Sequence, residues 1–130
     1  MHNKLIYVLE DNPDIAYILE YFLSEQGYQV QTFPTIASCN NAINNLKPDL
    51  FLLDIQLPDG NGIELCHQLK TNEKTAAIPV LIMSAGKAPA TNKLEAANEF
   101  ISKPFDLEDV LDRITHYLHP SQQNTPALAT

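Results

Sequence analysis

The hydrophobic and polar positions of this chain follow two periods that alternate along its length. Short, almost continuous apolar runs occupy residues 5–9, 50–53 and 79–83, and polar or turn-forming residues follow each run. Runs of this length are typical of parallel strands that are buried on both faces. Residues 28–33 alternate more strictly and predict a strand at the edge of the sheet, and residues 99–102 predict a fifth strand.

Apolar residues recur every three or four positions in most of the segments between these runs, which predicts helices there. The first helix is expected to begin at Pro13, after Asn12 as the N-cap, and to end at Gly27. Further helices are predicted over residues 35–46, 61–70 and 107–118, the last capped by Asp106, with a short helix within 90–97.

Strand and helix therefore alternate five times within 130 residues. This order predicts an α/β fold in which a five-stranded parallel sheet is covered by helices on both faces, as a doubly wound three-layer sandwich. We expect a single domain over residues 1–119. Residues 120–130 are rich in Ser, Gln, Asn, Thr and Pro and predict a flexible tail or linker.

Polar side chains follow four of the predicted strands at the point where each strand ends. Glu10 and Asp11 follow the first, Asp54 ends the third, Ser84 follows the fourth and Lys103 follows the fifth. In a parallel sheet these ends share one edge, where ligands bind. Clustered carboxylates repel one another unless a cation joins them, and oxygen ligands favour a hard ion, so we expect Mg²⁺.

These residues give the chain a resemblance to the receiver domains of two-component response regulators. The matching motifs are the acidic pair Glu10-Asp11, the acceptor Asp54, the downstream Pro58 and Gly62, the pair Ser84-Ala85 and the triplet Lys103-Pro104-Phe105. The resemblance covers residues 4 to about 118. It implies a flavodoxin-like fold with strand order 2-1-3-4-5.

The resemblance also implies a phosphorylation site. Asp54 is expected to accept a phosphoryl group from a phosphohistidine and form an acyl phosphate. Side chains of Asp11 and Asp54 and the backbone carbonyl of Gln56 are expected to bind Mg²⁺, while Glu10 acts mainly through a metal-bound water. The partners implied are a sensor histidine kinase or histidine phosphotransfer protein and a downstream effector domain or protein.

A conformational switch is implied by the same resemblance. Lys103 is expected to pair with Asp54 before transfer and with phosphate afterwards, and Ser84 to donate a hydrogen bond to phosphate. Phe100 corresponds to the switch aromatic, and the Lys103-Pro104 bond is expected to be cis. The added charge is expected to alter the face formed by the fourth helix, the fifth strand and the fifth helix. The resemblance also leaves open a homodimer that forms through this face.

Two features depart from the family pattern. The stretch from Ser84 to Lys103 is a few residues shorter than usual and contains Pro89, and Ala96-Ala97-Asn98 stands where a glycine usually precedes the fifth strand. We therefore expect the fourth helix to be short, shifted or partly unwound. Phe100 also lacks the hydroxyl of a tyrosine.

Composition and charge narrow the possible binding partners and the location of the protein. The net charge of −8 disfavours direct binding to nucleic acid, and no apolar run approaches the ~20 residues that span a bilayer. No signal peptide is visible, so we expect a cytoplasmic protein that does not bind membranes. Cys39 and Cys66 are too few and too far apart for a disulfide framework or zinc site, so we expect both to be buried.

The sequence disfavours two other functions and leaves a third open. A phosphatase or phosphotransferase with an aspartyl nucleophile is disfavoured, because haloacid-dehalogenase-like enzymes place a second acid where Gln56 stands. A dinucleotide-binding domain is disfavoured by Asp11-Asn12-Pro13 in place of a glycine-rich loop. A receiver-like interaction module that acts without phosphorylation stays as the alternative. We predict a phosphorylation-dependent switch and not an enzyme.

Overall fold

The computed structural model describes residues 4–85 and 97–119. Its elements are β1 (Leu5–Leu9), α1 (Pro13–Glu25), β2 (Gln29–Phe33), α2 (Ile36–Asn45), β3 (Leu50–Asp54), β4 (Gln56–Leu57), β5 (Gly60–Asn61), α3 (Gly62–Thr71), β6 (Val80–Ala85), β7 (Glu99–Lys103) and α4 (Leu107–Leu118). None of the helices in these two stretches is long and apolar enough to cross a membrane.

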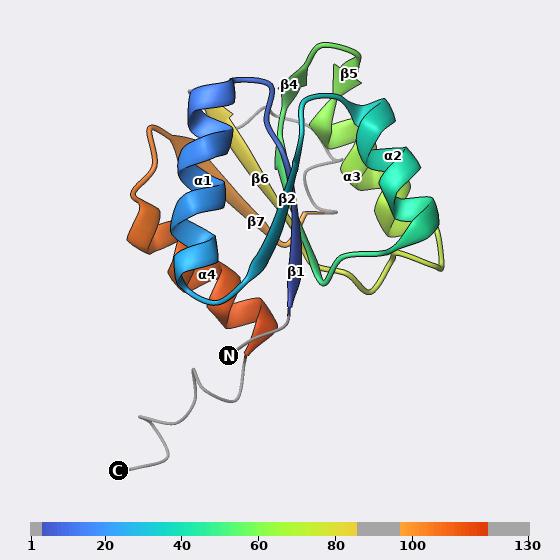
Figure 1. Ribbon diagram of the computed structural model, residues 1–130. Coiled ribbons are helices and arrows are strands. Elements are labelled where there is room, and N and C mark those ends of the chain that lie inside the picture. The colour runs from blue at the N-terminus through green and yellow to red at the C-terminus, as the bar shows by residue number, and fades with distance from the viewer. Residues whose placement is uncertain (1–3, 86–96, 120–130) are drawn as a thin grey trace.

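Five of the strands form one parallel sheet in the order β2-β1-β3-β6-β7 (Figure 1). Numbered along the chain as the five long strands, this is the predicted order 2-1-3-4-5, and the predicted fold is confirmed. The alternating strand β2 lies at the edge, as its pattern indicated. The most continuously apolar strands, β1 and β3, lie inside the sheet, where both of their faces are buried.

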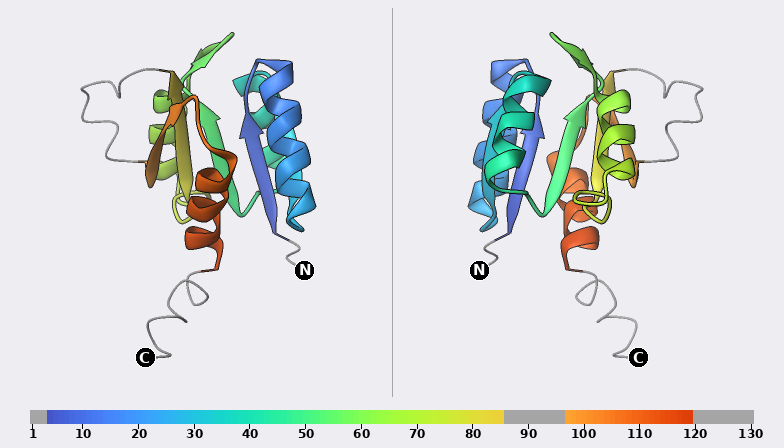
Figure 2. Two further views of the ribbon diagram at one scale, coloured as in Figure 1. Left: turned by 90° about the vertical axis from the view of Figure 1, so that its left-hand side faces the viewer. Right: turned by 90° about the vertical axis from the view of Figure 1, so that its right-hand side faces the viewer.

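Helices cover both faces of this sheet, α1 and α4 on one and α2 and α3 on the other (Figure 2). Alternate residues of β1 point into the two layers. Ile6 and Val8 pack with residues of α1 and α4, whereas Tyr7 and Leu9 pack with residues of α2 and α3. The period of two along each strand therefore builds two separate cores from one apolar run.

Polar caps start the helices and fix where they begin. The side chains of Asn12, Thr35, Asn61 and Asp106 each accept a hydrogen bond from a backbone N–H in the first turn of the helix that follows. The expected caps Asn12 and Asp106 are confirmed. Gly27, at φ 98°, takes the left-handed conformation just after α1 ends, as predicted.

Some elements differ from the sequence-based expectation. Strand β6 extends two residues further than predicted and includes Ser84 and Ala85. A short antiparallel hairpin, β4–β5, follows β3 and was not predicted, because two-residue strands carry no periodic signal. The predicted short helix within 90–97 and the predicted tail at 120–130 lie outside the described residues, apart from Ala97.

Asn98, directly before β7, joins two strands. Its side-chain Oδ1 accepts a hydrogen bond from the backbone N–H of Val80 at 2.8 Å. Its own N–H donates to the carbonyl of Val80, also at 2.8 Å. Asn98 thus fastens the start of β7 to the start of β6.

The two cysteines are free and buried, as expected. Cys39 lies in α2 and Cys66 in α3, both within the core beneath these helices. Burial raises the pKa of the Cys39 thiol to about 12 and that of Cys66 to about 11. Both side chains therefore act as small apolar residues.

Candidate functional site

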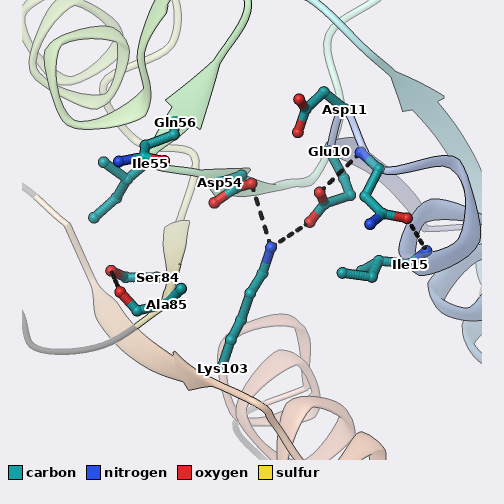
Figure 3. Close-up of a pocket in the computed structure, with 10 residues that line it drawn as sticks. Glu10, Asp11, Ile15, Asp54, Ile55, Gln56, Ser84, Ala85 and Lys103 are labelled. Carbon is teal, nitrogen blue, oxygen red and sulfur yellow. Dashed lines mark hydrogen bonds and ion pairs between the residues drawn. The ribbon is translucent and has the colours of Figure 1, made fainter.

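The carboxyl ends of β1, β3, β6 and β7 surround an open pocket of about 520 Å³ (Figure 3). It is lined by Glu10, Asp11, Asn12, Ile15, Asp54, Ile55, Gln56, Ser84, Ala85 and Lys103. The pocket lies at the sheet edge where open α/β folds bind ligands. Parallel pairing places the strand ends side by side, so residues far apart in sequence meet here.

Three carboxylates converge in this pocket. Glu10 and Asp11 come directly after β1, and Asp54 is the last residue of β3. Glu10 and Asp54 are buried, whereas Asp11 is exposed. One oxygen atom from each of the three lies within 4.8 Å of the others. The separation is small enough for one cation to contact all three groups.

Lys103 contributes the positive charge of the pocket from the last position of β7. Its ammonium Nζ lies 2.7 Å from Oε1 of Glu10 and 3.3 Å from Oδ2 of Asp54. Figure 3 shows the side chain reaching between the two carboxylates. The Lys103-Pro104 bond that follows is cis, as predicted. A single lysine thus bridges the ends of β1 and β3.

The nearer partner of Lys103 is Glu10, whereas the sequence suggested Asp54. Oε2 of Glu10 also accepts a hydrogen bond from the backbone N–H of Asn12 at 3.1 Å. Burial raises the pKa of Glu10, and the hydrogen bonds from Lys103 and Asn12 oppose this shift. Burial also lowers the pKa of Lys103, but the two carboxylates more than compensate and hold it above its ordinary value.

Ser84 and Gln56 line the pocket from two further segments. Ser84 lies within β6 and is buried, and its hydroxyl donates to the backbone carbonyl of Ala85 at 3.3 Å. Gln56 begins the hairpin β4–β5, two residues after Asp54. The structure therefore brings the sequence-predicted pocket residues together.

Gly62 holds the chain close to the end of β3. A Cβ atom at this position would lie 2.0 Å from the backbone oxygen of Asp54, so no other residue fits without a shift of the backbone. The N–H of Gly62 also donates to the carbonyl of Ile55 at 2.7 Å. This contact closes the base of the β4–β5 hairpin beside the pocket.

Phe100, the predicted switch aromatic, lies in β7 and not in the pocket lining. It is half-buried, stands opposite Ile82 of β6 and packs against the core beneath α2 and α3. The segment after Ala85, to which its movement was expected to respond, lies outside the described residues. The switching role of Phe100 stays a prediction.

The donor set suits a hard divalent cation. Glu10, Asp11 and Asp54 offer carboxylate oxygens, and Gln56, expected to contribute its backbone carbonyl, also lines the pocket. No cysteine or histidine is among the residues that line the pocket. All-oxygen ligands with an open side for water are typical of Mg²⁺ sites. Lys103 balances only part of the negative charge of the three acids, which further favours a cation.

The sheet order and the pocket define a doubly wound α/β domain that gathers three carboxylates and one ammonium group at one edge of its sheet. A sequence model of the family described as response regulator receiver domain matches residues 6–115. This match covers most of the chain, so the protein belongs to the family of response regulator receiver domains.

Individual relatives agree with this assignment. The chain is 33% identical over 113 residues to the DNA-binding dual master transcriptional regulator RpaA of Synechocystis sp.. The aligned region covers 84% of this chain and 46% of RpaA. The chain is also 33% identical over 123 residues to response regulator ArlR of Staphylococcus saprophyticus. Here the aligned region covers 91% of this chain and 54% of ArlR. The chain therefore spans about half the length of these curated relatives.

A solved structure shows the same fold. The signal receiver domain of a signal transduction histidine kinase from Syntrophus aciditrophicus matches with a TM-score of 0.79 at 26% sequence identity. The match covers 88% of this chain and 89% of that domain. Receiver domains similar to this chain thus occur both in regulators and in a histidine kinase.

Proposed function

We propose that this receiver domain is a phosphorylation-dependent signalling switch with Asp54 as the phosphoryl acceptor. The observation that carries the proposal is the convergence of three carboxylates within 4.8 Å, with the Lys103 ammonium 3.3 Å from Asp54. A buried carboxylate beside a lysine, open to a pocket, is arranged as a nucleophile for a phosphoryl group.

Mg²⁺ is the proposed cofactor. Asp11, Asp54 and the Gln56 carbonyl are the groups that hold it, with Glu10 in an outer position. When bound, the cation offsets the negative charge of the transferring phosphoryl oxygens. This electrostatic contribution is most of what phosphoryl transfer requires of a protein.

In the proposed transfer, a carboxylate oxygen of Asp54 forms a bond to phosphorus as the bond from phosphorus to the donor histidine nitrogen breaks. The imidazole keeps the electron pair of that bond. Lys103 then contacts a phosphate oxygen in place of the Asp54 carboxylate, while Ser84 rotates away from the Ala85 carbonyl and donates to a second phosphate oxygen. Both residues line the same pocket as Asp54, which supports these roles.

The signal is the new charge of about −2 on Asp54. We propose that movement of Ser84 is coupled to Phe100 and alters the face that β7 and α4 share with the predicted fourth helix. The proposed partners are a sensor histidine kinase or histidine phosphotransfer protein as donor, and an effector domain or protein as target. A homodimer through the same face is a further option.

The proposed domain limits are residues 1–119, with 120–130 as a tail or linker. The relatives carry additional sequence of similar length, so we propose that output belongs to a segment or protein other than this domain. The acidic net charge of −8 supports a receiver that does not itself contact nucleic acid. A cytoplasmic location is proposed for the same signalling role.

Acetyl phosphate with Mg²⁺ tests the proposal. Intact-mass spectrometry should show one phosphoryl group per chain in the parent protein and none in Asp54→Ala. Asp49→Ala is the matched control, because this aspartate precedes β3 at the opposite edge of the sheet and should leave incorporation intact. No incorporation in the parent would contradict the proposal and favour the interaction module, whereas sustained turnover of phosphoester would favour an enzyme.

A further inference from the structure

The hairpin β4–β5 is attached to the rest of the protein at its tip as well as at its base. The tip residue Asp59 places Oδ1 2.8 Å from the backbone N–H of Ile36 and Oδ2 3.0 Å from that of Ala37. These are the first two residues of α2. Figure 1 shows the hairpin at the same end of the molecule as the first turn of this helix.

Asp59 completes the N-terminal cap of α2, of which the local N-cap residue Thr35 supplies only part. The local cap Thr35 accepts a hydrogen bond from the N–H of Ser38, which leaves the two preceding N–H groups for Asp59. The first turns of α1, α3 and α4 each contain an acidic residue, whereas that of α2 contains none. The negative charge that favours a helix N-terminus therefore comes from a residue 23 positions away.

Other contacts agree with a close fit between hairpin and helix. A Cβ atom on Gly60 would lie 2.7 Å from Cδ1 of Ile36. Leu57 of the hairpin is buried in the same core against which Ile36 packs. The hydrogen bond from the N–H of Ile36 is the largest cause that holds the pKa of Asp59 below its ordinary value, and the one from Ala37 is the next largest. The carboxylate is therefore charged when it binds the helix.

The same hairpin carries a pocket residue. Gln56 pairs with Asn61 and Leu57 with Gly60, so the backbone at Gln56 is set by the hairpin. Asp59 itself does not line the pocket. Any influence of Asp59 on the pocket is therefore exerted through the position of the hairpin and not through contact.

We propose that Asp59 is a positioning residue for the cation site: by tying the hairpin to α2, it holds the Gln56 carbonyl at the edge of the pocket. This inference rests on the proposed function, because it assigns the Gln56 carbonyl as a ligand of Mg²⁺. Supporting groups one step removed from a metal commonly change its affinity by about 10-fold or more when they are removed.

Isothermal titration with Mg²⁺ on the full chain tests the inference. Asp59→Ala should raise the Mg²⁺ dissociation constant about 10-fold, and Asp59→Asn, which keeps one acceptor oxygen, should raise it less. The matched control is Thr35→Ala, which weakens the same helix end but leaves the hairpin attached. Amide hydrogen exchange at Ile36 and Ala37 reports loss of the attachment and should speed up in Asp59→Ala.

The outcomes separate this inference from the proposed function. Weaker Mg²⁺ binding in the Asp59 variants, with Thr35→Ala close to the parent, supports it. Equal weakening by Thr35→Ala assigns the effect to the stability of α2 and overturns it, as does unchanged affinity in both Asp59 variants. If Asp59→Ala does not fold, Asp59→Asn decides between these results. A parent protein that binds no Mg²⁺ would instead remove the metal site from the proposed function, and this inference with it.

Discussion

Strand β3 starts next to one aspartate and ends on another. Asp49 lies just before the strand, and its Oδ2 accepts the backbone N–H of Leu5 at 2.8 Å while its own N–H donates to the carbonyl of Leu5 at 2.7 Å. Asp54 closes the strand and faces the pocket, with Lys103 at 3.3 Å. The first aspartate is bound to the backbone of a neighbouring strand, whereas the second is bound to the side chain of a lysine.

The same contrast recurs on β7. Asn98 precedes this strand and exchanges two hydrogen bonds with Val80, just as Asp49 does with Leu5. Lys103 ends the strand and pairs with side chains from two other segments. Polar residues at the amino edge therefore have backbone partners, which folding alone provides. At the carboxyl edge, the charged side chains of Glu10, Asp54 and Lys103 are held chiefly by one another, although Glu10 also accepts a backbone N–H.

The contrast predicts that mutations at the two edges change stability for different physical reasons. At the amino edge, removal of a polar side chain leaves a backbone group unpaired. At the carboxyl edge, the outcome depends on the sign of the charge removed, because three acids share one lysine. Four sets of variants test this difference.

Lys103→Ala should have the largest effect. The side chain of Glu10 is 1% exposed, so loss of its ammonium partner leaves a buried charge uncompensated and should lower the free energy of unfolding by about 3 kcal/mol. Because burial raises the pKa of Glu10 above its ordinary value of 4.5, the deficit should shrink as the pH is lowered through that pKa and the carboxyl becomes neutral. Urea unfolding at several pH values measures both effects.

The double variant Glu10→Gln/Lys103→Ala is the control for this result. It removes the charge together with its partner, so most of the lost stability should return. A double variant as unstable as Lys103→Ala would show that the lysine stabilises the fold by packing of its stem and not by its charge.

Asp49→Ala should have the next largest effect. It leaves the N–H of Leu5, a buried residue, without its acceptor and should lower the free energy of unfolding by about 1.5 kcal/mol. Asp49→Asn keeps an acceptor oxygen and should lose much less. Chemical unfolding compares the two, and an equal loss in both would assign the role of Asp49 to its charge instead of its hydrogen bond.

Much of this arrangement could be predicted from sequence because it depends on local patterns. Continuous apolar runs identified β1 and β3 as inner strands, and the alternating pattern identified β2 as an edge. The residues of the pocket follow from a topological rule, since the carboxyl ends of parallel strands share one edge. The order of the motifs along the chain indicated the family, and the family resemblance implied the strand order.

Other features were missed because they depend on side-chain geometry or on distant contacts. The nearer approach of Lys103 to Glu10 is set by burial and reach, which one sequence does not encode in a readable pattern. The link from Asp59 to Ile36 spans 23 residues, and its only sequence signal is the missing acid in the first turn of α2. The β4–β5 hairpin is too short for any periodic signal.

Asp54→Asn should have a smaller effect, and in the opposite direction. Neutralising Asp54 relieves its repulsion with Glu10 and Asp11, while Lys103 keeps Glu10 as its nearer partner, so the free energy of unfolding should rise by about 1 kcal/mol without Mg²⁺. Saturating Mg²⁺ should remove this advantage, because the cation compensates the same repulsion in the parent. Thermal unfolding with and without Mg²⁺ measures the change, and a loss of stability in the absence of Mg²⁺ would contradict the contrast between the edges.

Asn98→Asp should have the smallest effect. The amide oxygen of Asn98 accepts the N–H of Val80, and a carboxylate oxygen can accept the same bond, as the oxygen of Asp49 does for Leu5. The free energy of unfolding should therefore change by less than about 0.5 kcal/mol, whereas Asn98→Ala should lower it by about 1 kcal/mol. Urea unfolding distinguishes the two. A large loss in Asn98→Asp would mean that the amino edge is sensitive to charge after all, and that the two edges differ less than their hydrogen bonds indicate.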